Sequence, residues 1–184
     1  DRLTIYMPTS PEAIALMLAT VRIGAIHSVV FAGFGAAALG GRIDASGSRL
    51  LFTCDVTWRK GKELDLKSIV DDAMKTSGQD VEHVIVLERR QAARPRSARE
   101  MTWDAFLKRG EGQSSEHSVM EANEAAYILA TSGTTAKPKL AVHTHGGYQV
   151  HIASMGRWCF GLKEEARRPA EEAIQAAHAL GLVA

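Results

Sequence analysis

Short strand and helix patterns alternate along the first part of the chain, and this alternation limits the possible folds more than any other feature. Leu3–Met7 and Ile26–Phe31 are apolar runs rich in β-forming residues. Between them, Ser10-Pro11-Glu12 supplies a hydroxyl N-cap, a proline for the first turn and an acid near the positive end of the helix dipole. Such alternation at short spacing is typical of parallel βαβ units. We therefore expect an α/β domain with mostly parallel strands and flanking helices.

Apolar spacing supports a helix after Pro11. One apolar set recurs at the helical spacing i, i+3, i+4 and i+7, namely Ile14, Met17, Leu18 and Val21. Gly24 is placed to end the helix. The sequence thus predicts a helix that ends at Gly24.

The same alternation continues along the chain. The sequence predicts a second helix after the turn at Gly33 and Gly35, a strand over Arg49–Thr53, a polar loop, a helix over Leu66–Met74, a strand over His83–Leu87, a helix over Met101–Lys108, strands over Tyr127–Ala130 and Leu140–His145, and a helix from Gly146 to about Phe160. The tryptophans Trp58, Trp103 and Trp158 are expected in a core or an interface.

The segment Tyr127–Lys139 carries the strongest indication of function. Its apolar strand leads into a loop with three kinds of anion donor: main-chain N–H groups near Gly133, hydroxyls and two lysines. The side-chain donors are Thr131, Ser132, Thr134, Thr135, Lys137 and Lys139. Polyphosphate is the ligand that suits this chemistry best. A polar surface loop without function is the alternative.

The loop is not a Walker A motif, because Ala136 stands at the second glycine position and Pro138 at the Ser/Thr position. It resembles the phosphate loop Thr-Ser-Gly-Ser/Thr-Thr-Gly-Lys-Pro-Lys-Gly of the adenylate-forming enzymes. Two glycines of that motif are replaced here, by Ala136 and Leu140. If position 136 requires a positive φ, the alanine costs about 1 kcal/mol.

Further segments resemble one branch of that superfamily, the AMP-forming acetyl- and propionyl-CoA synthetases. These segments are Arg22–Phe34, Gly41–Ile43, Trp58–Lys62, Val81–Val86 and His143–Tyr148. The resemblance covers residues 1–163, a partial AMP-binding N-terminal domain. Residues 164–184 are helix-prone and do not resemble the family. We therefore expect a truncated or frame-shifted product that is inactive alone.

The resemblance implies a ligase that activates acetate or propionate with ATP and Mg²⁺ and transfers the acyl group to coenzyme A. Lys137 is then the expected catalytic residue, because it would contact the pyrophosphate. Lys139 would do the same or would pair with a surface acid. The other ATP-phosphate contacts implied are Thr131, Ser132, Gly133, Thr134 and Thr135. The choice between acetate and propionate stays open.

The resemblance also implies a coenzyme A nucleotide site. Phe31, Ala32 and Gly33 would border the adenine, Arg59 would face the phosphates, and Lys62 stands at a position that is often basic. The alternative for Arg59 and Lys62 is a basic turn in water. A different function class also stays open: a non-catalytic phosphate- or coenzyme A-binding module whose helical tail serves association.

Charge and composition argue against several other partners. The net charge of +1 gives no bulk attraction to nucleic acid or to a membrane. Arg89–Arg99 holds five arginines but no interleaved aromatics, so we interpret it as a solvated insertion. The histidines at 143, 145 and 151 lack a partner carboxylate or cysteine at a metal-ligand spacing, which favours packing over a metal site. Cys54 and Cys159 fit reduced thiols in a cytoplasmic protein.

Overall fold

The computed structural model describes residues 1–90, 97–131 and 139–162. The chain divides into two compact units, residues 1–145 and 146–184. The described strands are β1 (Arg2–Tyr6), β2 (Ile26–Val29), β3 (Leu50–Cys54), β4 (Val56–Arg59), β5 (Lys62–Asp65), β6 (His83–Leu87), β7 (Glu100–Thr102), β8 (Ala125–Thr131) and β9 (Lys139–Thr144). The helices are α1 (Pro11–Arg22), α2 (Ala36–Ser46), α3 (Leu66–Thr76), α4 (Trp103–Gly110) and α5 (His145–Trp158).

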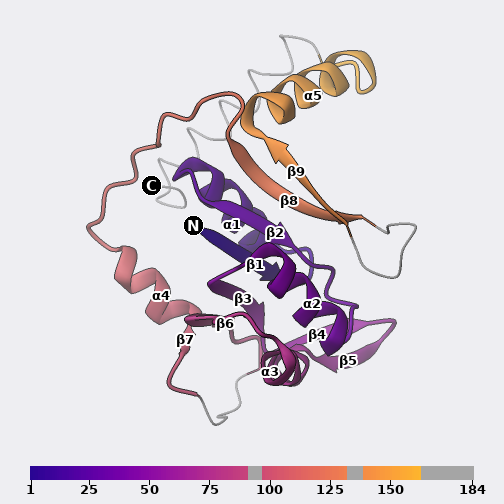
Figure 1. Cartoon of the computed structure of the whole chain (residues 1–184), viewed down its shortest axis with the longest axis vertical. Coiled ribbons are helices and arrows are strands. Elements are labelled where there is room, and N and C mark those ends of the chain that lie inside the picture. Colours follow the sequence, from indigo (N-terminus) through magenta and orange to yellow (C-terminus); the bar gives the residue numbers. More distant parts are fainter. Residues whose placement is uncertain (91–96, 132–138, 163–184) are drawn as a thin grey trace. The chain divides into compact units, whose positions relative to one another are not determined.

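The first unit is built on a seven-stranded sheet in the order β7-β6-β3-β1-β2-β8-β9. Every neighbouring pair is parallel except β8 and β9, which pair antiparallel (Figure 1). The expected α/β architecture with mostly parallel strands and flanking helices is therefore confirmed.

The connections reverse direction at β1. The chain passes from β1 to β2 on one side and then crosses to β3 on the other side of β1. In open parallel sheets, ligands bind outside the carboxyl ends of the strands near such a reversal. We therefore expect a ligand-binding site at the carboxyl ends of β1, β2 and β3.

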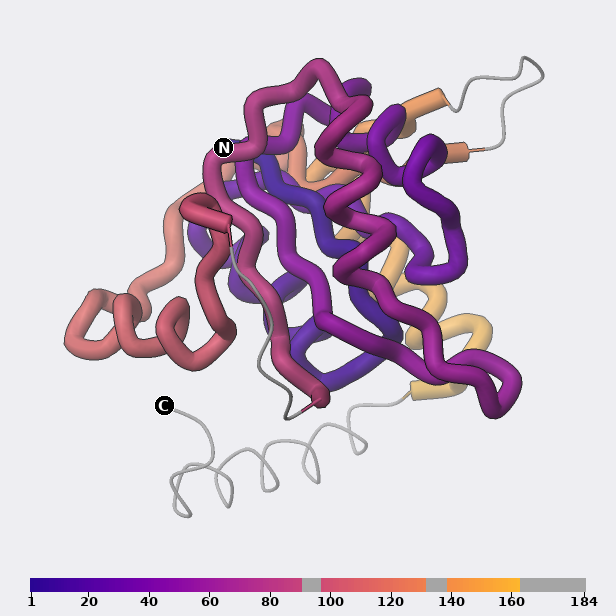
Figure 2. Tube along the Cα trace, turned by 90° about the horizontal axis from the view of Figure 1, so that it is seen from below, coloured from indigo at the N-terminus to yellow at the C-terminus, as the bar shows by residue number. Residues whose placement is uncertain are grey.

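Helices cover both faces of the sheet. On one face, Leu39 and Ile43 of α2 and Val70 of α3 pack against Tyr6, Leu51 and other fully buried strand side chains. On the opposite face, Leu16 of α1 belongs to a second core cluster, and Trp103 and Phe106 of α4 pack against that cluster. Figure 2 shows α2 and α3 beside each other, with α4 on the other side of the sheet.

The buried face of α1 coincides only in part with the apolar set, of which Met17 packs against the core. The structure buries Ala13, Leu16 and Thr20 and leaves Ile14 47% and Leu18 63% exposed. The helix is apolar around most of its circumference, so apolar spacing alone is compatible with more than one buried face. Small side chains let the helix approach the sheet closely, and the Thr20 hydroxyl donates to the Leu16 carbonyl at 2.6 Å. That stripe therefore faces the core.

The polar loop predicted after β3 is also wrong. Residues 56–65 form an antiparallel two-stranded hairpin, β4–β5. Its two-residue turn has positive φ at both positions, 50° at Lys60 and 74° at Gly61. Two consecutive positive φ values are characteristic of the type I′ turn that joins tight hairpins. Apart from this hairpin and the short strand β7, each described element lies close to its predicted position.

The second unit is described through α5 and the residues that follow it as far as 162. The predicted start near Gly146 agrees with the observed start at His145. In the described ranges, no helix is both long and apolar enough to cross a membrane. The predicted boundary between residues 163 and 164 lies at the edge of the described residues and stays a prediction.

Candidate functional site

A cavity of about 450 Å³ opens at the carboxyl ends of β1 and β2. Four of the five residues predicted to bind coenzyme A line it: Phe31, Ala32, Gly33 and Arg59. The remaining lining residues are Met7, Pro8, Thr9, Val29, Val30, Thr57, Trp58 and Leu129. The sheet thus brings the segment after β2 and the β4–β5 hairpin to one hollow.

Gly33 fits tightly between two of these side chains. A Cβ at position 33 would lie 2.3 Å from an Arg59 guanidinium nitrogen and 2.4 Å from the Phe31 ring. Any larger residue would therefore displace Arg59, Phe31 or both. The absence of a side chain here is what allows the guanidinium and the ring to stay where they are.

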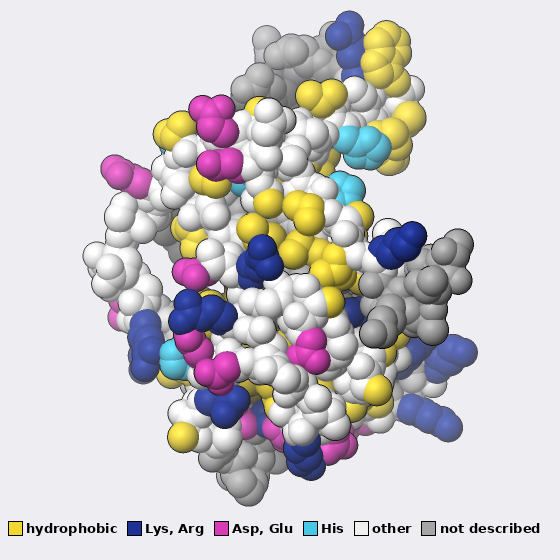
Figure 3. Space-filling model, in the orientation of Figure 1, with side chains coloured by type: hydrophobic (Ala, Val, Ile, Leu, Met, Phe, Trp, Pro, Cys, Tyr) yellow, Lys and Arg dark blue, Asp and Glu magenta, His cyan; other side chains and the backbone are white. Residues whose placement is uncertain are grey.

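Phe31 and Arg59 are placed to receive a flat, anionic ligand. The Phe31 ring is 57% exposed, and the guanidinium carbon of Arg59 lies 5.1 Å from its centroid. Aromatic faces stack on nucleobases, and guanidinium groups bind phosphate oxygens in a bidentate manner. Figure 3 shows exposed hydrophobic side chains beside Lys and Arg side chains on this view of the molecule.

A second aromatic–guanidinium pair supports the first. Phe34 meets Phe31 edge to face at 5.8 Å between centroids, and the Arg42 guanidinium carbon lies 4.2 Å from the Phe34 ring. The Tyr6 hydroxyl donates to the Phe34 carbonyl at 2.6 Å. Burial raises the pKa of Tyr6 to about 12, so its hydroxyl remains a donor at neutral pH. This bond fixes the turn that carries the Phe31 ring.

The β4–β5 hairpin contributes Trp58 and Arg59 to the cavity. Lys62 pairs with Arg59 across the hairpin but does not line the hollow. A core or an interface was expected for the tryptophans: Trp103 packs against the core, whereas Trp58 is 52% exposed and is not a core residue. Sequence reasoning missed Trp58 as a lining residue. The Lys60-Gly61 dipeptide was the available indication of a hairpin there.

The predicted phosphate loop is described only at its two ends. Thr131 and Lys139 are paired residues of β8 and β9, and the Thr131 hydroxyl donates to the Lys139 carbonyl at 3.2 Å. The predicted residues Ser132, Gly133, Thr134, Thr135 and Lys137 lie outside the described residues. The two strands therefore fix where the loop starts and returns, beside β2 at the same end of the sheet as Leu129 of the cavity.

Three rings stack across β2, β8 and β9. His27 stacks on Tyr127 at 5.5 Å, and Tyr127 stacks on His143 at 4.5 Å between centroids. Burial lowers the pKa of His27 to about 4, and its Nδ1 has no hydrogen-bond partner in the structure. The packing role predicted for His143 is confirmed. Within the described ranges, no group of three or more His, Cys, Asp or Glu side chains is arranged to hold a metal ion.

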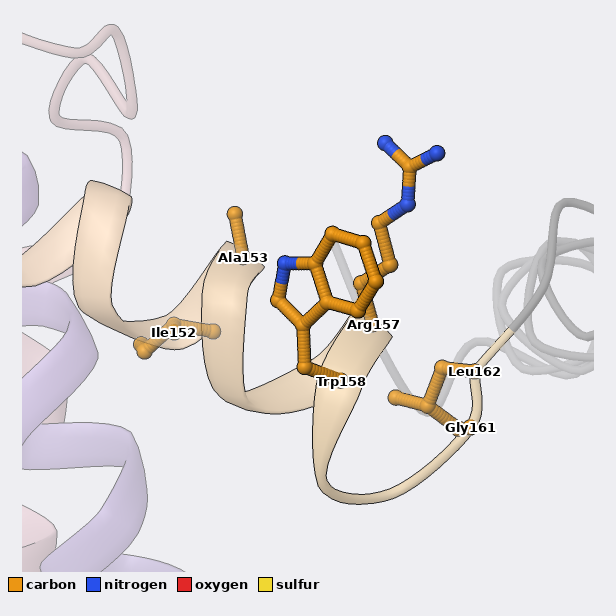
Figure 4. Close-up of a pocket in the computed structure, with 7 residues that line it drawn as sticks. Ile152, Ala153, Arg157, Trp158, Gly161 and Leu162 are labelled. Carbon is orange, nitrogen blue, oxygen red and sulfur yellow. The ribbon is translucent and has the colours of Figure 1, made fainter.

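A second hollow lies in the second unit, at the end of α5. It measures about 790 Å³, and its lining includes Trp158, Arg157 and Leu162 (Figure 4). The Arg157 guanidinium carbon lies 5.3 Å from the Trp158 ring, and Trp158 is 78% exposed. None of the residues predicted to bind a ligand lies in this hollow, so the cavity at β1 and β2 is the candidate site.

Comparison with known proteins identifies the family of the chain. The family model described as "AMP-binding enzyme" matches residues 1–181. The chain belongs to the family of AMP-binding enzymes. This confirms the resemblance to the adenylate-forming superfamily that the loop after β8 indicated.

Individual relatives are similar over most of the chain. The acetyl-coenzyme A synthetase of Psychrobacter cryohalolentis is 46% identical over 166 residues, and the 3-hydroxypropionyl-coenzyme A synthetase of Metallosphaera sedula is 42% identical over 168 residues. Each alignment covers 90% of this chain and 25% of the relative. The acetyl-coenzyme A synthetase of Salmonella typhimurium is 44% identical over 164 residues, 87% of this chain and 25% of that protein. The chain thus spans about a quarter of the length of these relatives.

Proposed function

We propose that this chain supplies the coenzyme A and ATP-phosphate binding surfaces of an AMP-forming acyl-CoA synthetase that acts on acetate or propionate. The observation that carries the proposal is the shared cavity, in which Phe31 and Gly33 of the segment after β2 meet Arg59 of the β4–β5 hairpin. The names of the relatives, acetyl- and 3-hydroxypropionyl-coenzyme A synthetase, support the same class of reaction.

The described residues suit the nucleotide of coenzyme A. The exposed ring of Phe31 offers a stacking surface for adenine, and Ala32 and Gly33 leave room beside it. Arg59 would bind phosphate oxygens in a bidentate manner, and Lys62 on the next strand would add a point charge. Because Gly33 has no Cβ, the Arg59 guanidinium and the Phe31 ring can lie next to each other at the cavity, and this arrangement supports a ligand there.

The loop between β8 and β9 would serve ATP. In this reaction class a carboxylate attacks the α-phosphate of ATP, pyrophosphate leaves, and the thiol of coenzyme A then displaces AMP. Lys137 would hold the pyrophosphate, together with Thr131, Ser132, Gly133, Thr134, Thr135 and Lys139. Mg²⁺ would neutralise the same phosphates. The role of this chain is thus positioning and charge stabilisation.

Titration of the purified chain with coenzyme A tests the proposal. We expect saturable binding, and we expect Arg59→Ala to weaken it about 10- to 100-fold, since a hydrogen bond to a charged group contributes about 1.5–3 kcal/mol. Lys75→Ala is the matched control, because Lys75 is an exposed cation on α3 that pairs with Asp72. Absence of saturable binding by the unmodified chain would contradict the proposal.

We further propose that the 184 residues alone bind without turnover, because the chain corresponds to a quarter of each relative's length. Adenylation needs the acid, ATP and the thiol held together, and a partial site lacks the required effective molarity. Acetate-dependent AMP formation by the purified chain would refute this statement and would leave the coenzyme A site untouched.

A further inference from the structure

Asp55 lies between β3 and β4, and its carboxylate accepts hydrogen bonds from main-chain N–H groups. The residue is 7% exposed. Its Oδ1 accepts hydrogen bonds from the N–H of Val56 at 2.7 Å and of Arg89 at 2.8 Å, and its Oδ2 accepts one from the N–H of Arg90 at 2.9 Å. One buried carboxylate therefore joins the start of the hairpin to the segment that follows β6.

The main-chain N–H and carbonyl of Asp55 are hydrogen-bonded as well. Its N–H donates to the Leu87 carbonyl at 3.1 Å, and its carbonyl accepts from the N–H groups of Leu66 at 2.9 Å and Lys67 at 3.1 Å. The residue thus connects β3, the end of β6 and the first turn of α3. Such a junction leaves the local backbone little freedom to shift.

The two arginines that Asp55 holds reach back to the hairpin. The Arg89 guanidinium carbon lies 5.1 Å from the Trp58 ring, and Arg90 forms an ion pair with Glu63. Trp58 and Glu63 face each other across β4 and β5. The next cross-strand pair toward the turn is Arg59 with Lys62. Arg89 therefore contacts β4 at Trp58, and Arg90 contacts β5 at Glu63. This cross-strand pair is the immediate neighbour of the pair that contains Arg59.

We propose that Asp55 is a positioning residue of the coenzyme A site, which rests on the function proposed above. Its carboxylate fixes the main chain of Arg89 and Arg90, and their side chains fix the hairpin. The hairpin in turn orients Trp58 and Arg59 toward the cavity. Asp55 touches no ligand in this scheme and acts through the hairpin alone.

Asp55→Asn tests the role with two readouts on the whole chain, coenzyme A titration and amide hydrogen exchange. The amide of asparagine offers one acceptor oxygen in place of two, so at least one main-chain bond is lost. We expect about tenfold weaker coenzyme A binding. We also expect faster exchange confined to residues 56–65 and to the amides of Arg89 and Arg90, with amides of β1 and β3 unchanged.

Asp44→Asn is the matched control. Asp44 also accepts from a main-chain N–H, that of Gln79 at 3.0 Å, but it lies on α2 away from the hairpin. We expect neither readout to change in this variant.

The combined Arg89→Ala and Arg90→Ala variant keeps the main-chain hydrogen bonds to Asp55 and removes the side-chain contacts with Trp58 and Glu63. It should therefore weaken coenzyme A binding to a similar extent. Adding Asp55→Asn to it should then weaken binding little further.

The outcomes separate this role from the function on which it rests. Equal coenzyme A affinity of Asp55→Asn and the unmodified chain overturns the role and leaves the function intact. Exchange that accelerates throughout the sheet also overturns it, because the residue would then be merely structural. If the unmodified chain fails to bind coenzyme A, the proposed function falls and the role falls with it. If Asp55→Asn does not fold, the double arginine variant decides.

Discussion

The Nζ of Lys67 lies 2.7 Å from Oε1 of Glu100, and both side chains are nearly inaccessible, at 7% and 4% exposure. The pair joins the first turn of α3 to β7, the strand at one edge of the sheet. Lys67 also forms an ion pair with Asp71 one helical turn later. Two charges buried together in this way depend on each other, because either one left alone would lack its compensation.

Removing one partner of this pair should therefore destabilise the fold strongly. We expect Lys67→Met or Glu100→Gln to lower the free energy of unfolding by about 3 kcal/mol, as measured by urea denaturation. The double variant should lose less than the sum of the two. Lys75→Gln, which breaks the exposed pair with Asp72, should change stability by less than about 0.5 kcal/mol. Additive single losses would show that the two charges are not coupled.

Gly33→Ala should weaken coenzyme A binding while the fold persists. The atoms nearest to the new Cβ would belong to two side chains, Arg59 and Phe31, which can shift without moving the backbone. We expect about tenfold weaker binding and a change of less than about 1 kcal/mol in unfolding free energy. Gly35→Ala is the control, because a Cβ there would meet open space. Unchanged affinity in Gly33→Ala would place the nucleotide elsewhere.

His27 should make the stability of the chain depend on pH. Its pKa falls from 6.5 to about 4 on folding because burial disfavours the charged ring. The neutral ring is therefore favoured in the folded state, and its contribution is complete above pH 6.5 and is lost as the pH falls toward 4. We expect a loss of about 3 kcal/mol from this residue between pH 7.5 and 4, since the pKa falls by about 2.5 and one pKa unit corresponds to about 1.4 kcal/mol. Urea denaturation between pH 4 and 7.5 measures it.

His27→Phe serves as the comparison for that series, because phenylalanine keeps a ring to stack on Tyr127 but cannot take up a proton. We expect a shallower decline of stability below pH 6.5 in this variant. An identical pH profile in both proteins would mean that other groups cause the decline.

Lys137→Met should weaken binding of Mg²⁺–ATP by about 10- to 100-fold, since an ammonium that contacts phosphate contributes about 1.5–3 kcal/mol. Lys139→Met addresses the two alternatives for that residue. An equal loss would assign Lys139 to the phosphates, and no loss would assign it to a surface pair. Isothermal titration with ATP measures both. Retention of full affinity in both variants would rule out the loop as the ATP-phosphate site.

The sequence was informative where local chemistry decides the structure. Ser10 caps α1 as predicted, with its hydroxyl accepting from the Ala13 N–H at 3.3 Å. The buried strands were recognisable because both of their faces are covered, so they read as continuous apolar runs. The resemblance placed Phe31 and Arg59 in one site, and the structure brings them to one cavity.

Long-range packing determined what the sequence did not reveal. The sheet-facing side of α1 depends on how closely Ala13 and Thr20 approach the strands, which apolar spacing does not encode. The β4–β5 hairpin has no continuous apolar stripe, and it is held by Arg89 and Arg90 from a distant segment. The exposure of Trp58 was not predictable for the same reason, because it depends on where the hairpin projects.

The position of β8 beside β2 has a consequence for how the sheet is assembled. Tyr127 of β8 pairs with His27 of β2 although the two are a hundred residues apart, whereas β1 pairs with β2 and β3, which are much nearer in sequence. During synthesis from the N-terminus, β2 therefore carries an open hydrogen-bonding edge until β8 emerges. Open edges recruit strands from other chains, and late non-local pairing lengthens the time in which they can do so. Chaperone dependence and aggregation of nascent chains should thus be greatest before residue 131 has left the ribosome.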